Sequence, residues 1–366
     1  MSVKVLHVFG IMNRGGAELR TISGIEGMKR RGVEFDFLVL SGSKGVLDSS
    51  LIEQGCKIHY CKLGAKFPFQ FIRILRQGQY DIVHSHVSLV SGIILALAKI
   101  VGINTTIAHF RSTHDVQHKS TFRKLRDFVL RRLLLLSASK ILAVCQGAMD
   151  AFWPPSWRDN TKFSVIYNGF DIALPEFQKN FWAKYISGYS GQDVIVNVAR
   201  MHEQKNHKGL AHIFSNFAQK NDDAQLVLIG KEDPHIKSMM IDIFKRYKCF
   251  DRVTFLGEKA DVYPFVYHSS LMLFPSAWEG LPGAVIESAC LGTPVVGSEI
   301  PGIVEISRQL NTVVTVPLDA PLEFWSSRIE ELIQQPVDKE KSRNEFMSSD
   351  FRLEANIDQL YGAYRS

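Results

Sequence analysis

The sequence predicts an α/β protein made of two Rossmann-like domains that face a central cleft. Short apolar runs alternate with amphipathic stretches, which is the pattern of parallel strands covered by helices. This alternation stops near residues 163–177 and then starts again. The chain has 366 residues, of which 46% are hydrophobic, and this is enough for two domains with separate cores.

The first half contains five predicted strands with predicted helices between them. The strands are the apolar runs at residues 3–9, 35–40, 57–63, 81–87 and 105–110. Residues 18–31 and 88–101 have the apolar periodicity of helices. The N-terminal run is predicted as a strand because it lacks the long apolar centre and the cleavage site of a signal peptide.

Turn-forming residues separate the two halves. The stretch at 163–177 contains Asn168, Gly169 and Pro175, which favour turns, so we predict a linker here. Further strands are predicted at residues 193–200, 224–230, 252–257, 271–276 and 293–298. The predicted domains are therefore residues 1–168 and 169–350, and the amphipathic stretch 351–366 is expected to form a helix that packs back on the first domain.

The two halves differ strongly in charge. Residues 1–168 carry 23 lysines and arginines against 11 acidic residues, a net charge of +12. Residues 169–366 carry 20 against 26, a net charge of −6. A basic half suits an anionic lipid, a nucleic acid or a phosphorylated substrate. Since no nucleic-acid-binding module is found, we expect no nucleic-acid partner and favour lipid or phosphate.

The cysteines and the longest apolar run bear on the location of the chain. The five scattered cysteines form no C-x-x-C pair, so they indicate neither a zinc site nor a disulfide framework. The run at residues 89–103 contains Lys99 and is too short to cross a bilayer. We therefore expect a cytoplasmic chain, or one that also touches the inner face of the cytoplasmic membrane at its surface.

Candidate anion-binding residues follow the first strand of each half, where ligands bind to open parallel sheets. Gly15 and Gly16 precede a helix expected to open at residue 17 or 18, and glycines there let N–H groups approach an anion. The same pair also fits a tight turn, and the G-x-G-x-x-G dinucleotide pattern is absent. In the second half, Arg200 and Lys205 could converge on one anion, although such pairs are also typical of solvated surfaces.

The stretch WEGLPGAVIE at residues 278–287 is the most informative. Pro282 fits the first helical position, and the free N–H groups of the helix start suit a diphosphate. These N–H groups would be those of Gly283, Ala284 and Val285. Glu287 lies on the same helix face and can accept hydrogen bonds from a diol such as a ribose. Glu279, before the helix, can reach a second hydroxylated ring.

The spacing Glu279-x7-Glu287 resembles the E-x7-E signature of retaining glycosyltransferases of family 4, which have the glycosyltransferase-B fold. Six further blocks occur in the order of that family: NRGGAE, DIVHSH, TTIAHF, VIYNGFD, VARMHEQKNH and VTFLGEKADV. A lone E-x7-E is a weak signal, but seven ordered blocks along nearly the whole chain are specific. The chain most resembles bacterial transferases of capsule, exopolysaccharide or O-antigen synthesis.

The resemblance implies that residues 169–350 bind a nucleotide-sugar donor and that residues 1–168 face the acceptor. Arg200 and Lys205 would neutralise the leaving diphosphate, and Gly16 would approach its phosphates from the other domain. Glu279 would hold hydroxyls of the donor sugar, and Glu287 would hold the ribose. Residues 256–262 match the stretch that binds the base, with Leu256, Glu258 and Val262 as the candidates.

His109 matches the histidine that lines the reaction centre of the family, so it is a candidate catalytic residue together with Glu279. A lone histidine at a strand end is otherwise usually structural. The acceptor-side candidates are Asn13, Gly15, His84 and His86. The sequence has no D-x-D pair, so we expect no metal and no other cofactor. Fixed cations and helix-start N–H groups would replace the metal.

A basic amphipathic segment occupies residues 120–140. Its cations are Arg123, Lys124, Arg126, Arg131 and Arg132, placed between leucines and phenylalanines. Such a helix can lie on an anionic membrane. A solvated helix packed on the acceptor domain gives the same pattern, so the sequence leaves both interpretations open.

The predicted function is metal-independent, retaining transfer of a sugar from a nucleotide-sugar, in the first place a UDP-sugar, to a lipid-linked or polysaccharide acceptor of the cell surface. A non-hydrolysing nucleotide-sugar epimerase on the same fold is one alternative, and the E-x7-E block argues against it. A non-catalytic nucleotide-sugar-binding protein is the other. The complete set of Arg200, Lys205, Glu279 and Glu287 argues against that alternative.

Overall fold

The computed structural model describes residues 2–113, 120–335 and 337–365, and the chain divides into two compact units. Unit 1 comprises Met1–Phe170 together with Asp350–Ser366, and unit 2 comprises Asp171–Ser349. The first boundary lies two residues after the predicted position at 168. The second lies one residue before the predicted position, because Asp350 belongs with the C-terminal helix.

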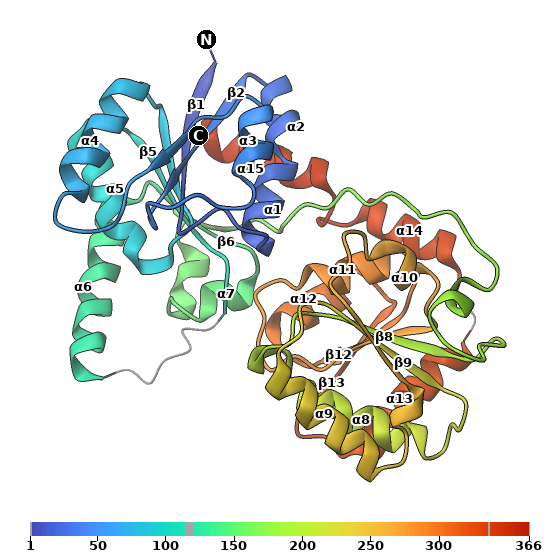
Figure 1. Ribbon diagram of the computed structural model, residues 1–366. Helices are drawn as coiled ribbons and strands as arrows, with labels where there is room; N and C mark the ends of the chain where they lie inside the picture. Colours follow the sequence, from blue (N-terminus) through green and yellow to red (C-terminus); the bar gives the residue numbers. More distant parts are fainter. Residues whose placement is uncertain (1, 114–119, 336, 366) are drawn as a thin grey trace. The chain divides into compact units, whose positions relative to one another are not determined.

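Unit 1 is built on a parallel sheet of seven strands in the order β3-β2-β1-β4-β5-β6-β7 (Figure 1). The strands are β1 (Val3–Phe9), β2 (Val33–Val39), β3 (Ile58–Tyr60), β4 (Ile82–Ser85), β5 (Thr105–Phe110), β6 (Lys140–Ala143) and β7 (Phe163–Val165). The strand order reverses between β1 and β4. In sheets of this kind the loops part at such a reversal and leave room for a ligand at the carboxyl ends of the strands.

Helices cover both faces of this sheet (Figure 1). One side carries α1 (Gly16–Ser23), α2 (Ile25–Arg30), α3 (Asp48–Glu53) and the C-terminal α15 (Leu353–Arg365). The other side carries α4 (Phe67–Gly78), the short η1 (Ser88–Val90), α5 (Ser91–Ile100) and α6 (Thr121–Ser137). The remaining elements are α7 (Gln146–Asp150) and η2 (Pro155–Asp159). Ile357 and Tyr364 bring α15 into the same core as β1, β2 and α2.

Unit 2 has a parallel sheet of six strands in the order β10-β9-β8-β11-β12-β13. The strands are β8 (Val194–Val198), β9 (Gln225–Ile229), β10 (Val253–Gly257), β11 (Leu271–Phe274), β12 (Val295–Ser298) and β13 (Val313–Val316). Here the order reverses between β8 and β11. The two units therefore repeat one topology, and each has its switch point beside its first strand.

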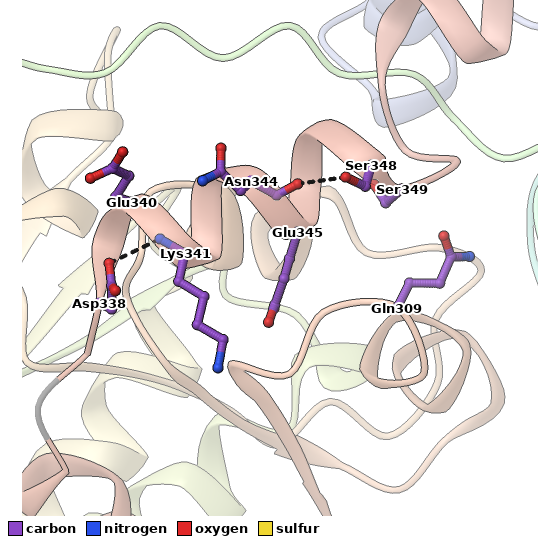
Figure 2. Close-up of a pocket in the computed structure, with 8 residues that line it drawn as sticks. All are labelled: Gln309, Asp338, Glu340, Lys341, Asn344, Glu345, Ser348 and Ser349. Carbon is purple, nitrogen blue, oxygen red and sulfur yellow. Dashed lines mark hydrogen bonds between the residues drawn. The ribbon is translucent and has the colours of Figure 1, made fainter.

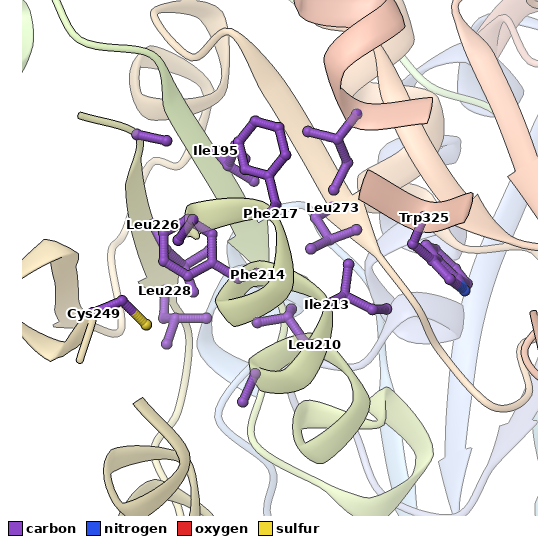
Figure 3. Packing of buried hydrophobic residues seen from close by; sticks show 14 of the residues in the cluster. Ile195, Leu210, Ile213, Phe214, Phe217, Leu226, Leu228, Cys249, Leu273 and Trp325 are labelled. Atoms are coloured by element: carbon purple, nitrogen blue, oxygen red, sulfur yellow. The ribbon is translucent and has the colours of Figure 1, made fainter. Parts of the chain in front are cut away.

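The helices of unit 2 follow the same alternation. They are η3 (Phe181–Lys184), η4 (Glu203–Lys205), α8 (His207–Ala218), α9 (Pro234–Arg246), η5 (Phe250–Arg252), α10 (Tyr263–Tyr267), α11 (Gly283–Cys290), α12 (Pro301–Ser307), α13 (Leu322–Gln334) and α14 (Lys339–Ser348). Figure 3 shows one face of the core, where Leu210, Phe214 and Phe217 of α8 pack on Leu226 and Leu228 of β9. Ile195 of β8 and Leu273 of β11 belong to the same core, and these two strands lead to the loops of the candidate site.

The predicted α/β class with two parallel sheets is confirmed, and several element predictions are corrected. The expected helix at 18–31 is two helices, α1 and α2, divided at Gly24, where a glycine weakens helix propagation. Residues 163–165 of the expected linker form β7, the edge strand of the first sheet. The sequence analysis missed β6 and β13, which have four residues each.

The structure also bears on the membrane question. Within the described ranges, no helix is both long enough and apolar enough to span a bilayer.

Candidate active site

The predicted site residues lie where the two topologies place ligand sites. In unit 2, Arg200 and Lys205 follow β8, and Glu279 follows β11, so they border the switch point of that sheet. In unit 1, Gly15 and Gly16 follow β1, and the histidines lie on or just after β4 and β5. Each unit therefore assembles its own set of candidate residues at a carboxyl edge.

Backbone and amide contacts join the loop after β8 to the loop after β11. The backbone N–H of Ala277 donates to the carbonyl of Gln204 at 2.8 Å. The Gln204 side-chain amide donates to the carbonyl of Trp278 at 2.8 Å. Asn206, which caps α8, also donates to the carbonyl of Pro275 at 3.1 Å. These contacts hold the two loops as one structure and fix the positions of the charges that they carry.

Lys205 and Glu279 form an ion pair in this joined structure. Lys205 Nζ lies 2.5 Å from Glu279 Oε1, and their side chains are only 17% and 8% exposed. Gln204 Nε2 donates to the other carboxylate oxygen at 3.2 Å. The sequence predicts that Lys205 binds phosphate and that Glu279 binds sugar hydroxyls. The predicted phosphate ligand and the predicted sugar ligand are therefore in direct contact. Arg200, by contrast, is exposed directly after β8.

The start of α11 differs by one position from the sequence prediction. Pro282 is the N-cap of the helix and not its first residue. The free N–H groups at the helix start are still those of the three predicted residues, Gly283, Ala284 and Val285. Gly302 of α12 packs against the carbonyl of Gly280, at a distance that leaves no room for a Cβ atom. A neighbouring helix therefore holds the turn before α11.

Glu287 and the predicted base-binding stretch lie close together. Glu287 is half-buried on α11, and the Tyr263 hydroxyl of α10 donates to its carboxylate at 3.5 Å. Tyr263 directly follows Val262, which is the N-cap of α10. Leu256 lies near the end of β10, and Glu258 is exposed in the loop after it. The structure thus joins the predicted ribose and base positions through one hydroxyl group.

Strand register places four histidines on one face of the first sheet. His7 of β1 pairs with His84 of β4, and Ile107 of β5 also pairs with His84. His86 and His109 each lie two residues further along, so the alternation of side chains puts all four rings on the same face. The rings of His84 and His109 are stacked with their centroids 5.3 Å apart. This face is the one that α2 and α15 cover.

Hydrogen bonds connect these histidines in two chains. His84 Nδ1 lies 2.8 Å from the Tyr364 hydroxyl, and His84 Nε2 lies 3.1 Å from His109 Nδ1. In the second chain, His7 Nδ1 lies 3.0 Å from His86 Nε2, and Arg111 Nε donates to His86 Nδ1 at 3.3 Å. Nε2 of His109 and Nε2 of His7 are buried, and neither has a hydrogen-bond partner among the described residues.

The four imidazoles are neutral at neutral pH. Burial, together with the nearby Arg111 charge, lowers the pKa of His7 to about 3. Burial also lowers the pKa of His84, His86 and His109 well below its ordinary value, and Arg111 adds to the effect on each. Burial lowers the pKa of Arg111 itself to about 10, so the guanidinium keeps its charge.

Arg111 is the cation of this cluster. It donates to Asn168 Oδ1 at 2.6 Å and to the Thr21 hydroxyl at 3.4 Å, besides its contact with His86. The sequence analysis did not select Arg111, although its place directly after a strand was a usable signal. It also missed His7 and Tyr364. Nothing in the sequence connects Tyr364 with His84, which is 280 residues away.

Three of these histidines lie close enough together to share a metal ion. The ligand atoms of His7, His84 and His86 lie within 4.8 Å of one another. In the described contacts, however, Nδ1 of each ring is engaged with a neighbour, and Arg111 places a positive charge beside His86. A cation there would have to displace these hydrogen bonds and approach a guanidinium. The cluster is better suited to hydrogen bonding than to metal binding.

In the loop after β1, several candidate residues make contacts within the protein that hold the loop itself. α1 begins at Gly16, one residue earlier than expected, and Gly15 is its N-cap in an extended conformation. Asn13 Oδ1 accepts a hydrogen bond from the backbone N–H of Val46 at 3.2 Å, so this acceptor-side candidate also fixes the loop. The Glu18 carboxylate folds back against Gly15. Burial raises the pKa of Glu18.

The basic segment is a single helix, α6, with an unusual surface. Arg126 forms an ion pair with the buried Asp127 at 2.8 Å. Arg131 and Arg132 lie over the rings of Trp153 and Phe128. Large apolar side chains of the helix are exposed, namely Phe122 (80%), Leu125 (62%), Phe128 (56%), Val129 (54%) and Leu136 (83%). A solvated helix normally exposes polar groups in such positions.

One hollow of unit 2 lies in the region of α14. Its volume is about 660 Å³, and Asp338, Lys341 and Glu345 of the α14 region are among the residues that line it (Figure 2). The close-up shows polar side chains with local hydrogen bonds, such as that between Lys341 and Asp338. None of the predicted site residues lines it.

Comparison with known proteins agrees with this arrangement. The family described as "Glycosyltransferase Family 4" matches residues 14–174, and the family "Glycosyl transferases group 1" matches residues 192–335. The capsular polysaccharide biosynthesis glycosyltransferase CapH of Staphylococcus aureus is 30% identical over 342 residues, with 91% of each chain covered. The UDP-Gal:alpha-D-GlcNAc-diphosphoundecaprenol alpha-1,3-galactosyltransferase of Escherichia coli is 26% identical over 242 residues, covering 63% of this chain and 60% of that one.

A solved structure supports the fold. The Anabaena protein HepE, crystallised with UDP and glucose, superposes with a TM-score of 0.77 over 98% of both chains at 20% identity. Its likeness extends over both units, and the two parallel sheets have the topology expected of a glycosyltransferase-B fold. With the match to CapH over nine-tenths of both sequences, the chain belongs to glycosyltransferase family 4, and it is a glycosyltransferase.

Proposed function

We propose that this enzyme transfers a sugar from a UDP-sugar to a lipid-linked glycan acceptor in the synthesis of a surface polysaccharide, with retention of configuration and without a metal. The observation that carries the donor part is the joined pair of loops in unit 2. It places Lys205, Glu279 and the start of α11 at one switch point.

Each part of the donor would meet a group of suitable charge at the carboxyl edge of the second sheet. The N–H groups at the start of α11 and the Lys205 ammonium would take the diphosphate, because both offer positive charge to an anion. The Glu279 carboxylate, 2.5 Å from Lys205, would accept hydrogen bonds from the sugar hydroxyls. Glu287 would accept those of the ribose, beside Tyr263. Uridine is proposed as the nucleoside of the donor because HepE was solved with UDP and because the Escherichia coli relative is named for UDP-Gal.

The reaction would proceed on one face of the sugar ring. The bond from the anomeric carbon to the phosphate oxygen breaks, and a bond to the acceptor oxygen forms on the same side. The acceptor O–H bond breaks, and its proton passes to an oxygen of the leaving phosphate. Lys205 and the helix-start N–H groups would stabilise the negative charge that develops on the diphosphate. Retention itself is proposed from the family resemblance.

The lipid-linked acceptor is proposed from the relatives and from one surface. CapH is named for capsular polysaccharide biosynthesis, and the Escherichia coli enzyme for a sugar on diphosphoundecaprenol. In this chain, α6 combines five basic residues with five exposed apolar ones. Such a helix can lie in the interface of an anionic bilayer. We therefore propose that α6 docks unit 1 on the cytoplasmic membrane that holds the acceptor.

A donor screen followed by product analysis tests the proposed reaction. UDP-, GDP- and ADP-sugars would be compared by thermal shift, since a ligand at 100 times its Kd stabilises by about 2.7 kcal/mol. The stabilising donor is then incubated with a diphosphate lipid that carries one sugar, and the new linkage is examined by NMR. We expect transfer with the anomeric configuration of the donor. An inverted product, an epimerised donor, or donor binding without any product would contradict the proposal.

Vesicle sedimentation tests the membrane surface separately. Replacing the five cations of α6 with Gln should release the protein from anionic vesicles at low salt, since each basic residue near the surface contributes about 1 kcal/mol. A matched control replaces five exposed cations of unit 2 in the same way: Lys208, Lys220, Lys245, Arg246 and Lys248. Equal sedimentation of the two variants would exclude α6 as the docking surface, and the glycosyltransferase assignment would be unaffected.

A further inference from the structure

We propose that Tyr364 is a positioning residue. It acts through His84 to hold His109 in the tautomer that carries its proton on Nε2, so that His109 offers a hydrogen-bond donor to the substrate and not a base. This inference rests on the proposed function for the identity of the substrate, but the proton arrangement itself follows from the contacts of unit 1.

The direction of the hydrogen bonds that run from Arg111 through His86 to His7 is fixed by the chemistry of the guanidinium group. A guanidinium only donates, so His86 Nδ1 must accept from Arg111 Nε at 3.3 Å. A neutral His86 then carries its proton on Nε2 and donates to His7 Nδ1 at 3.0 Å. His7 is left with a proton on Nε2. His7 lines a small cavity of about 10 Å³, which is room for about one water molecule.

The direction of the hydrogen bonds that join Tyr364, His84 and His109 follows from the number of buried polar groups that each direction leaves without a partner. If Tyr364 donates to His84 Nδ1, then His84 Nε2 donates to His109 Nδ1. Among the described contacts of these three residues, this leaves one group without a partner, the N–H at His109 Nε2. In the reverse direction, His109 Nδ1 donates to His84 Nε2, and His84 Nδ1 donates to the Tyr364 oxygen. The described contacts then leave two groups without a partner, the hydroxyl proton of Tyr364 and the lone pair of His109 Nε2. A buried polar group without a partner is costly, so the first arrangement is favoured.

Electrostatics support the neutral, protonated tyrosine as the start of the chain. Burial raises the pKa of the Tyr364 hydroxyl, so it keeps its proton at neutral pH. His84 and His109 are 0% and 1% exposed, and burial keeps both neutral. His109 does not line the small cavity beside His7. The N–H of His109 has no acceptor among the described residues. Because ligands bind at the carboxyl ends of strands in open parallel sheets, a ligand atom at the end of β5 would be its acceptor.

This arrangement limits what His109 can do in the reaction. A neutral imidazole with its proton on Nε2 has no lone pair there, so it cannot take the proton of the acceptor hydroxyl. It can hold an oxygen atom, either a hydroxyl of the donor sugar or an oxygen of the departing phosphate. The proton of the acceptor must then go elsewhere, which agrees with its proposed transfer to the leaving phosphate.

Long-range 1H–15N spectra of the imidazoles test the tautomer directly. The full chain is labelled with 15N-histidine, and the signals of His84 and His109 are assigned by their loss in H84Q and H109Q. We expect both rings to be protonated on Nε2. In Tyr364→Phe, both proton arrangements leave one nitrogen of His84 and one nitrogen of His109 without a partner. Neither tautomer of His109 is then favoured, so the chemical shifts of its two ring nitrogens should move toward a common average value. Tyr361→Phe is the matched control, because it removes a hydroxyl of the same helix that contacts only Arg365 in the described structure.

Kinetics separate positioning from a merely structural role. With the donor found above, Tyr364→Phe should lower kcat about tenfold while the donor KM stays within about twofold, and Tyr361→Phe should change neither. Protonation of wild-type His109 on Nδ1 would overturn the proposal, as would an unchanged tautomer in Tyr364→Phe. A shifted tautomer with an unchanged kcat would overturn the catalytic consequence. If no donor supports transfer, the proposed function fails, and the spectra still decide the tautomer.

Discussion

The candidate sites of the two units handle charge in opposite ways. In unit 1, four imidazoles are made neutral by burial on the face of a sheet, and Arg111 supplies the cation beside them. In unit 2, an ammonium and a carboxylate form an ion pair on two loops beyond the strand ends. The sheet of unit 1 can fix the direction of hydrogen bonds, whereas the loops of unit 2 can present full charges to an anion.

The difference shows that the place of a titratable side chain in the fold affects whether it carries a charge. A strand interior is rigid and excludes water, so a titratable group there loses its charge and serves as an oriented dipole. On the loops of unit 2, Lys205 and Glu279 are also largely buried, but each charge has the other as its ion-pair partner. For this reason we expect variants of unit 2 to change affinity for the donor, and variants of unit 1 to change the chemical step and the response to acid.

The largest effect is expected for Lys205→Ala. It removes the proposed partner of the diphosphate, and UDP binding should weaken by about 1.5–3 kcal/mol in calorimetry. It also leaves the largely buried Glu279 without its ion-pair partner, which should lower the free energy of unfolding by about 3–5 kcal/mol.

The double variant K205A/E279Q separates the two effects of that substitution. It removes the unpaired charge, so stability should recover while UDP affinity stays low. If the folded Lys205→Ala protein binds UDP as tightly as the wild type, Lys205 is not a phosphate ligand.

Acid should destabilise unit 1 more than unit 2. The pKa of the unit 1 imidazoles is lower in the folded protein than the unfolded value near 6.5, and for His7 it is about 3. The unfolded chain therefore binds more protons as the pH falls below about 6.5. Stability is complete above that pH and is lost as the pH falls toward the folded values.

Hydrogen exchange between pH 7.5 and pH 5 resolves this loss by region, after correction for the intrinsic rate. Protection should fall in β1, β4 and β5 before it falls in β8, β9 and β11. In unit 2, burial also lowers the pKa of His207, to about 4, but His212 and His268 are only half-buried. Equal loss of protection in both sheets would contradict this contrast between the units.

Arg200→Ala should have a smaller effect than Lys205→Ala. Arg200 is exposed, so its removal leaves no buried charge, and the free energy of unfolding should change by less than about 0.5 kcal/mol. If it contacts the diphosphate, UDP affinity should still fall by about 1.5 kcal/mol, the lower end for a hydrogen bond to a charged group. Unchanged affinity in calorimetry would remove Arg200 from the donor site and leave Lys205 as the proposed cation.

The smallest effect is expected from removal of metal ions. EDTA should leave transfer unchanged, because helix-start N–H groups and Lys205 would stabilise the leaving diphosphate, and the described hydrogen bonds of His7, His84 and His86 engage their Nδ1 atoms. Initial rates with EDTA, and then with added magnesium or manganese, provide the measurement. A rate that EDTA abolishes and only a divalent metal restores would contradict this expectation.

The sequence by itself determined the two parallel sheets, because the alternation of apolar runs and amphipathic stretches repeats on each side of Asn168 and Gly169. It also located the start of α11 to within one residue, since turn and N-terminal signals are local. Signals of this kind depend on neighbours within a few residues. Short strands are less secure in such a prediction, and β6 and β13, with four residues each, were missed.

Only the tertiary structure decided which side chains meet. The ion pair of Lys205 and Glu279 joins loops 74 residues apart, and its geometry depends on the adjacency of β8 and β11. The register of β1 against β4 sets His7 beside His84, and a shift of one residue would turn either ring to the other face. The return of α15 to the first sheet brings Tyr364 to His84. Such contacts depend on register and packing, which the order of residues within a single strand does not contain.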